Sequence, residues 1–395
     1  RLNADNGDDF LSELDQHWSA AKQKTFVADE TTLPFRGGWF IYLGYELAGQ
    51  IEPTLTLPEF EPSFPTAFAT RIPAAVIRNH KTNQLFLIAE TEQKSLISTM
   101  RDDVKRCATV QKLNTARQEN LIDTLVEEDP QRYIDGIEKI KRYIIEGDIF
   151  QVNLSRVWRA DFKKSPSAVE LYQRLRETNP APFAALITHE QGSIISSSPE
   201  RLVEVIDNRV NTRPIAGTRP RGDSKSQDQE LLKTLIEHPK ERAEHVMLID
   251  LERNDLGRIC VPGTIHVDEL MGLESYAHVH HIVSSVSGVK QKNTTPGEVI
   301  RALFPGGTIT GCPKVRCMEI IAELEETGRG PYTGSVGYLN HNGDMDFNIL
   351  IRTLFLQGKK LQLRAGGGIV ADSDPNLELN ESRAKARGLI LALTE

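Results

Sequence analysis

The segment TLFLQGKKLQL, residues 353–363, constrains the fold more than any other feature of the chain. Two short runs of apolar and polar residues flank a turn at Gly358. So short a connection joins antiparallel strands, because a parallel pair needs a crossover of about a dozen residues or more. The segment AAVIRNHKTNQLFLIAE, residues 74–90, shows the same arrangement. We therefore expect sheets that are largely antiparallel.

Helical segments lie between the expected strands without a regular βα repeat. Asp129 is a good N-cap, Pro130 follows at the first helical position, and Gly147 ends the apolar periodicity. Residues 239–256 and 374–393 also predict helices. These patterns indicate a mixed α/β (α+β) fold rather than a doubly wound nucleotide-binding fold. A polar, poorly periodic stretch, 101–129, separates an N-terminal region, 1–125, from a catalytic region, 126–395.

Charge and composition exclude several classes of function. A net charge of −8 argues against a nucleic-acid surface. No apolar run approaches the roughly 20 residues of a membrane span. The four cysteines form no C-x-x-C pair, and no histidine cluster completes a metal site. Reduced thiols and a cytoplasmic location are therefore expected.

Two of the expected helices each carry a Glu-x-x-Glu pair, Glu241 with Glu244 and Glu378 with Glu381. This spacing places both carboxylates of a pair on one helix face. If the two faces meet, four carboxylates repel one another unless protons or a hard cation such as Mg²⁺ neutralise them. Two separate, solvated helix faces are the alternative.

Three further features are candidates for binding or proton transfer. Arg352 is a charge in an apparently apolar strand, and it needs either a structural carboxylate or a substrate carboxylate. His281 begins an alternating strand, where it is either structural or a proton carrier. The contiguous glycines 366–368 either let backbone N–H groups approach an anion or form a bulge. The residues alone indicate an enzyme that binds Mg²⁺ and a small polycarboxylate.

Several motifs in unbroken order resemble one family of enzymes. They are GDIFQVNLSR, SSSPERL, PIAGTRPRG, KERAEHVMLIDLERNDLGRIC, FPGGTITGCPK, YTGSVGY, IRTL and AGGGIVADSDPNLELNESRAKA. Together they resemble the chorismate-utilising enzymes, which include the large subunits of anthranilate synthase and aminodeoxychorismate synthase and the isochorismate and salicylate synthases. The resemblance covers about residues 130–395. It implies two antiparallel sheets packed as a sandwich with helices outside, the two regions being intertwined.

The resemblance also assigns roles to individual residues. It implies that one Mg²⁺ holds the ring carboxylate of chorismate, and that the metal is surrounded by Glu241, Glu244, Glu378 and Glu381. The residues implied in binding the substrate carboxylates are Tyr332, Arg352, Gly366, Gly368 and Lys385, with Gly217 and Thr218 in the same pocket. Glu200 is implied as the acid that protonates the departing C4 hydroxyl, and His281 as a proton carrier.

Two substitutions bear on the nucleophile. Gln151 stands where water-adding members carry a lysine base, and an amide cannot act as a base, so ammonia is the expected nucleophile. Ala216 stands where many aminodeoxychorismate synthases carry a nucleophilic lysine, and by itself it favours anthranilate synthase. The segments AGGGIVADS, YTGSVGYL, IRTL and FRGGWFIYLGYELAGQIEP favour aminodeoxychorismate synthase instead. A route in which ammonia replaces lysine at C2 reconciles the two indications.

The resemblance also implies binding partners. None of the four cysteines lies in a glutaminase segment of the type G-x-C-x-G-x-Q, so a separate glutamine amidotransferase subunit is expected to supply ammonia. The N-terminal region is expected to hold a tryptophan-like ligand, as it does in relatives. A regulatory subunit that binds chorismate without converting it is the non-enzymatic alternative. It is disfavoured because every matched acidic and carboxylate-binding position carries a competent residue.

Overall fold

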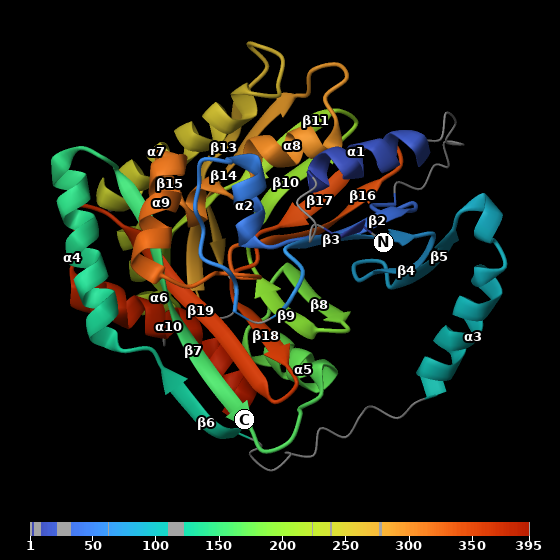
Figure 1. Ribbon diagram of the computed structural model, residues 1–395, viewed down its shortest axis with the longest axis horizontal. Helices are drawn as coiled ribbons and strands as arrows, with labels where there is room; N and C mark the ends of the chain where they lie inside the picture. Colours follow the sequence, from blue (N-terminus) through green and yellow to red (C-terminus); the bar gives the residue numbers. More distant parts are fainter. Residues whose placement is uncertain are drawn as a thin grey trace.

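The computed structural model describes residues 2–3, 9–21, 33–61, 63–109, 122–222, 224–237, 239–275 and 279–394. The side chains of Ala216, Thr218 and Glu241 lie outside the described part, although their backbones belong to regular elements. The predicted class is confirmed, because the described strands form antiparallel sheets with helices packed around them (Figure 1).

The larger sheet has the strand order β1-β3-β2-β16-β17-β10-β11-β14-β12, and β13 also pairs with β14. Its strands are β1 (Leu2–Asn3), β2 (Gly38–Leu43), β3 (Ala67–Ile72), β10 (Arg201–Ile206), β11 (Arg209–Arg213), β12 (Ile215–Pro220), β13 (His266–Ser275), β14 (Val279–Val289), β16 (Ser335–Asn340) and β17 (Met345–Asn348). Strand β2 from the N-terminal region pairs directly with β16. Strands from both ends of the sequence thus share one sheet.

The smaller sheet has the order β15-β7-β19-β18-β9-β8, and β6 also pairs with β7. Its strands are β6 (Ile122–Glu127), β7 (Gln151–Phe162), β8 (Phe183–His189), β9 (Gly192–Ser198), β15 (Gly311–Cys312), β18 (Thr353–Gln357) and β19 (Lys360–Ile369). Strands β18 and β19 form the hairpin predicted for residues 353–363. The boundary proposed near residue 125 falls inside β6, which is hydrogen-bonded to β7.

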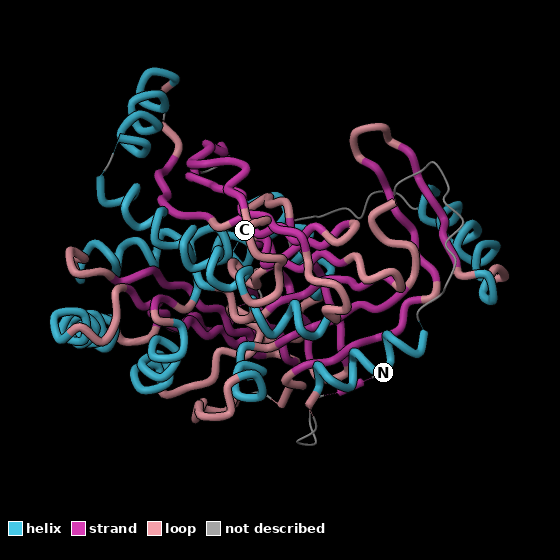
Figure 2. Tube along the Cα trace, turned by 90° about the horizontal axis from the view of Figure 1, so that it is seen from above, coloured by secondary structure: helices cyan, strands magenta, loops and turns pink. Residues whose placement is uncertain are grey.

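Helices surround the two sheets in Figures 1 and 2. They are α1 (Phe10–Ala21), α2 (Ala48–Ile51), α3 (Leu96–Thr109), α4 (Pro130–Glu146), α5 (Ala168–Thr178), α6 (Lys225–Glu237), α7 (Pro239–Gly257), α8 (Pro296–Leu303), α9 (Lys314–Glu325) and α10 (Pro375–Thr394), with 3-10 turns η1 (Tyr45–Leu47), η2 (Thr91–Gln93) and η3 (Gly307–Ile309). Helix α4 begins and ends as predicted, since the Asp129 side chain accepts from the Gln131 N–H and Gly147 has a φ of +86°.

The start of the stretch 101–129 is a correction to the sequence analysis. Helix α3 continues through residues 101–109, although their polarity and weak periodicity gave no sign of a helix. Figure 1 shows α3 at one edge of the molecule, beside the separate two-stranded sheet formed by β4 (Ala74–Asn79) and β5 (Gln84–Ala89). The partly buried apolar residues of α3 are Leu96, Ile97, Met100 and Val104, and three of them precede residue 101. The polar stretch that begins at residue 101 therefore holds too little of the stripe to predict a helix.

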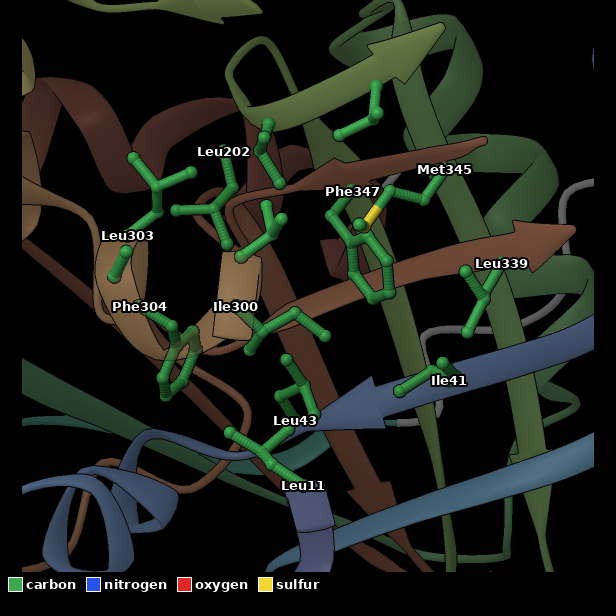
Figure 3. Close-up of a cluster of buried hydrophobic side chains, with 14 of the residues drawn as sticks. Leu11, Ile41, Leu43, Leu202, Ile300, Leu303, Phe304, Leu339, Met345 and Phe347 are labelled. Carbon is green, nitrogen blue, oxygen red and sulfur yellow. The ribbon is translucent and has the colours of Figure 1, made fainter. Parts of the chain in front are cut away.

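The largest hydrophobic cluster lies on one face of the larger sheet. Ile41 of β2, Leu339 of β16 and Phe347 of β17 are fully buried there, and Ile300 of α8 packs against the same cluster (Figure 3). These strands come from distant parts of the sequence, so the cluster joins the N-terminal and catalytic regions in one core. Truncating a side chain such as Phe347 to alanine typically costs about 3–5 kcal/mol.

Two of the connections between the sheets are short and lie side by side. Strand β9 of the smaller sheet continues into β10 of the larger one through Pro199 and Glu200, and β17 returns to β18 through residues 349–352. The two crossings are hydrogen-bonded to each other, from the Ile349 N–H to the Glu200 carbonyl at 3.0 Å. Both crossings therefore place their side chains where the sheets meet.

Arg352 lies in the second crossing and not inside a strand, which corrects the sequence analysis. Strand β17 ends at Asn348 and β18 begins only at Thr353, so Arg352 lies between the two strands. Its φ is +53°. Few non-glycine residues adopt this left-handed conformation, and those that do are often found at functional sites. Its carbonyl accepts a hydrogen bond from the Ser197 N–H at 3.0 Å, which ties this conformation to β9.

Candidate active site

A polar cavity of about 180 Å³ opens where the two sheets meet, between α7 and α10. Strands β7, β12, β14 and β19, the turn η3 and both crossings contribute residues to its lining. The lining residues that the sequence had singled out are Gln151, Glu200, Gly217, Glu244, His281, Tyr332, Arg352, Gly366, Gly368, Glu378, Glu381 and Lys385. The fold thus brings together nearly all of the candidate residues whose side chains it describes.

A second cavity, of about 760 Å³, is larger but has a different character. It lies on the other side of α7, and apolar side chains such as Phe150, Met247 and Leu251 contribute much of its lining. The converging glutamates and the carboxylate-binding candidates line the smaller cavity. Binding sites are recognised by convergent polar and titratable groups, so the smaller cavity is the candidate active site.

The contiguous glycines of β19 are explained by close packing against β7. The ladder pairs Gly366 with Ser155, Gly367 with Leu154 and Gly368 with Asn153 in continuous register. There is no bulge at these positions. A Cβ atom at Gly366 would overlap the Leu154 carbonyl, and one at Gly368 would overlap the side-chain amide of Gln151. Glycine is required here so that the backbone itself forms the cavity wall.

Three glutamates converge on the glycine strand from the two covering helices. A Cβ built at Gly367 would lie 3.4 Å from Glu378 Oε2 and 3.9 Å from Glu381 Oε1, and one at Gly368 would lie 3.3 Å from Glu244 Oε1. Side chains of α7 and α10 therefore reach neighbouring residues of β19, while the Glu381 side chain remains 52% exposed. That the glutamates of both helices share one cation stays a prediction.

Each of these carboxylates has a protein partner. Gln151 Nε2 donates to Glu244 Oε1 at 2.6 Å, Ser373 Oγ donates to Glu378 Oε1 at 2.7 Å, and Lys385 Nζ lies 2.8 Å from Glu381 Oε1. Within the described ranges no three acidic, histidine or cysteine side chains are already gathered as metal ligands. The donors are all carboxylate oxygens, which is the chemistry that Mg²⁺ prefers. The residue types therefore fit a hard cation, although the three carboxylates are not gathered around one point in this structure.

A cationic wall faces the acids. Arg352 and Lys385 line the cavity beside Tyr332, and Lys385 Nζ also donates to the Gly366 carbonyl at 2.9 Å. Burial opposes the charge on Lys385, but the nearby Glu381 carboxylate raises the pKa of this ammonium group overall. Burial lowers the pKa of Arg352, although a guanidinium stays charged at any physiological pH. Two fixed cations and a buried phenol can hold carboxylates of a ligand.

Glu200 has the environment of a general acid. It is only 4% exposed, and burial raises its pKa from 4.5 to about 7. The Ile215 N–H at 3.5 Å from Oε1 and the charges of Arg352 and Lys385 oppose the shift without cancelling it. A carboxyl with a pKa near neutrality can hold a proton and release it to a leaving group.

His281 is held as a neutral imidazole. It is 3% exposed on β14, and burial, followed by the charge of Arg352, lowers its pKa to about 4. A hydrogen bond with the backbone of Gly217, whose φ is +67°, works in the opposite direction. Neutral at physiological pH, His281 can accept a proton rather than supply a positive charge.

Several residues of the site were not found from the sequence. Asn153, Thr308 and Arg364 line the cavity, and Arg364 belongs to a buried cluster with Glu325 and Arg329. Arg329 Nη2 lies 2.6 Å from Glu325 Oε1, and Arg364 Nη2 lies 2.7 Å from Glu325 Oε2. Asn153 was within reach of sequence reasoning, because it follows Gln151 by two residues and so shares its strand face.

Comparisons with known proteins were consistent with this geometry. The model of the chorismate binding enzyme family matches residues 1–391. An anthranilate synthase component I-like protein of Synechocystis is 43% identical over 363 residues, which are 91% of this chain and 73% of that protein. Aminodeoxychorismate synthase component 1 of Bacillus subtilis is 40% identical over 365 residues, 91% of this chain and 77% of that protein.

The three-dimensional comparison agrees. Anthranilate synthase component I from Streptococcus pneumoniae TIGR4 superposes with a TM-score of 0.84 at 31% identity, covering 97% of this chain and 85% of that one. The chain belongs to the family of chorismate binding enzymes, and the predicted family and fold are confirmed. Among the described helices, none has the length and apolar character needed to cross a bilayer.

Proposed function

We propose that this chain is the large subunit of an aminodeoxychorismate synthase, which converts chorismate and ammonia to 4-amino-4-deoxychorismate. The observation that carries the proposal is the pairing of Gln151 with Glu244 in a cavity that also holds the buried acid Glu200. Gln151 cannot activate water, so the nucleophile must be one that needs no base. Ammonia meets that requirement.

The proposed reaction begins with ammonia adding at C2 of chorismate while Glu200 donates its proton to the C4 hydroxyl, which leaves as water. The adduct, 2-amino-2-deoxyisochorismate, forms when the added nitrogen loses one proton, which restores Glu200 directly or through solvent. A second ammonia then attacks C4, and the C2 amine takes up a proton and leaves as ammonia. The new nitrogen at C4 gives up one proton, which balances the proton taken by the leaving group. One ammonia is consumed and one water released, and the enolpyruvyl group is kept.

The residues of the chain would position the substrate for both steps. Arg352, Lys385 and Tyr332 are proposed to hold its carboxylates, while neutral His281 is proposed to carry a proton from the entering nitrogen to the leaving one. Thr218 and the Gly217 backbone are proposed to complete this pocket. Ala216 cannot form the covalent C2 adduct of lysine-bearing relatives, so ammonia takes that place.

Mg²⁺ is proposed to bind beside the glycines of β19, where Glu244, Glu378 and Glu381, together with Glu241, would hold it. When bound, the metal would neutralise these acids and hold a substrate carboxylate as a Lewis acid. Glu244→Gln and Glu381→Gln should each abolish Mg²⁺-dependent turnover and weaken Mg²⁺ binding in calorimetry, while circular dichroism stays unchanged. Near-normal Mg²⁺ binding in both variants would contradict the assignment.

Anthranilate synthase is the second candidate, because Ala216 favours it and several similar proteins carry that name. Product analysis separates the two. The purified chain is incubated with chorismate, Mg²⁺ and an ammonium salt, and the products are identified by mass spectrometry. A 4-amino product that retains enolpyruvate supports the proposal, whereas anthranilate with pyruvate supports the second candidate. Binding of chorismate without conversion would indicate a regulatory subunit.

A separate glutamine amidotransferase subunit is proposed as the source of ammonia. At neutral pH most ammonia in solution is ammonium, so direct delivery of the neutral molecule would raise the rate. Turnover with glutamine should require the second subunit, whereas turnover with ammonium salt should not. Glutamine-dependent turnover by the purified chain alone would contradict this part of the proposal.

A further inference from the structure

Three buried oxygen atoms on one side of the cavity lack a hydrogen-bond donor. Gln151 and Asn153 are 3% and 9% exposed, and both line the cavity from the same face of β7. Gln151 Oε1, Asn153 Oδ1 and Thr308 Oγ1 have no hydrogen-bond partner within the described ranges. Buried acceptors are seldom left unpaired, because an unmade hydrogen bond destabilises the folded state. Their grouping in a cavity indicates a ligand that donates hydrogen bonds.

The neighbouring contacts fix which atoms are acceptors. Gln151 Nε2 donates to Glu244 Oε1 at 2.6 Å, and Asn153 Nδ2 donates to the Thr308 carbonyl at 3.5 Å. Turning either amide over would direct an oxygen at another oxygen, so both amide oxygens remain the free ends. The Thr308 hydroxyl lies near enough to Glu200 to lower the pKa of that carboxyl, but it makes no hydrogen bond of ordinary geometry.

The segments that carry these atoms are held side by side. The Asn153 N–H donates to the Thr310 carbonyl at 2.9 Å, which joins β7 to the end of η3. Strand β15 continues this contact, because Gly311 pairs with Val152. The backbone segments that carry the three acceptors are therefore joined to one another.

The chemistry of this wall differs from that of the rest of the cavity. Arg352 and Lys385 offer positive charge, which suits the carboxylates of a substrate, whereas the wall of Gln151, Asn153 and Thr308 offers neutral acceptors. A carboxylate has no hydrogen to donate to them. Ammonia can donate through its N–H bonds and still keep its lone pair for attack on carbon.

We propose that Gln151, Asn153 and Thr308 form a subsite that binds and orients the ammonia nucleophile. The inference rests on the proposed function, in which ammonia is the nucleophile, and it names the residues that bind this ammonia. Asn153 and Thr308 are assigned here as substrate-binding residues. The subsite uses neutral acceptors, so it holds the molecule without requiring it to be ammonium.

The test compares kinetic constants for the two substrates separately. Wild type, Asn153→Ala and Thr308→Val are assayed with Mg²⁺ and ammonium salt, and rates are plotted against free NH₃ at one pH. Losing one acceptor should raise the KM for NH₃ by about threefold to tenfold and leave the KM for chorismate within about twofold. The matched control is Thr212→Val. Like Thr308, the buried Thr212 hydroxyl in β11 makes no hydrogen bond of ordinary geometry but lies near enough to a carboxyl, here Glu252, to lower its pKa, and Thr212 does not line the cavity.

The outcomes separate the subsite from the function on which it rests. If wild type forms no amino product from ammonium salt, the proposed function fails before any variant is considered. If wild type is active, an unchanged KM for NH₃ in both variants overturns the subsite. A selective rise in the KM for chorismate also overturns it, because these residues would then bind that substrate. Thr308→Val removes only a hydroxyl, so it decides the question if Asn153→Ala does not fold.

Discussion

The raised pKa of Glu200 makes a specific prediction about the pH dependence of turnover. With a pKa of about 7 instead of the ordinary 4.5, about half of the carboxyl is protonated at pH 7. An ordinary glutamate would be about 0.3% protonated at that pH, so burial increases the acid form roughly 150-fold. Above a pH of about 8 the acid form falls tenfold with each pH unit, and the rate should fall with it.

The assay must separate this effect from the titration of the nucleophile. Raising the pH converts ammonium to ammonia, so the total ammonium is adjusted to keep free NH₃ constant. We expect kcat/KM for chorismate to be level below neutrality and to decline above it, since this ratio reports ionisations of the free enzyme. Glu200→Gln should lower the rate by about 10²–10⁴-fold and abolish the decline.

Two controls sharpen the interpretation. Glu204→Gln removes a carboxyl of the following strand β10 that pairs with Arg201 at 2.9 Å and does not line the cavity, so it should leave the profile unchanged. Glu252 is the rival titrating group, because it is buried, its pKa is raised to about 8 and the charge of Glu200 contributes to that rise. A decline that survives Glu200→Gln, or one that Glu252→Gln abolishes, would refute the reasoning.

Three further predictions follow from single positions. Ala216→Lys should allow a covalent C2 adduct, seen as added mass on the intact protein after incubation with chorismate; no adduct would show that the pocket needs more than the amine. Gly368→Ala should reduce activity strongly, because its methyl group would overlap a side-chain amide of β7, whereas Gly257→Ala, with nothing within 4 Å, should be neutral. The third prediction concerns Glu252 of α7. Burial, followed by the charge of Asp255 on the same helix, raises the pKa of Glu252 from 4.5 to about 8. The folded state then keeps a proton that the unfolded chain has lost, so the free energy of unfolding should fall from about pH 4.5 to pH 8. Glu252→Gln should flatten that part of the curve in urea denaturation.

Local patterns in the sequence determined the elements of this protein. The helix from Pro130 to Glu146 was defined by its own capping residues, and the β18–β19 hairpin by a turn at Gly358, because both depend on contacts between neighbours in the chain. The Glu-x-x-Glu pairs were visible for the same reason. Helix α3 was missed because most of its apolar stripe, Leu96, Ile97 and Met100, lies before the polar stretch that begins at residue 101.

Only the tertiary structure decided how these elements combine into a site. The sequence left open whether the two glutamate pairs come together. In the structure the side chains of Glu244 from α7 and of Glu378 and Glu381 from α10 reach the neighbouring glycines 367 and 368 of β19. Arg352 looked like part of a strand, yet it lies where the chain crosses between sheets, beside the crossing that carries Glu200. Its positive φ and the burial that raises the pKa of Glu200 arise from contacts between distant segments. Such contacts have no local signature, since hydrogen bonding and desolvation at a position depend on residues far away in the sequence.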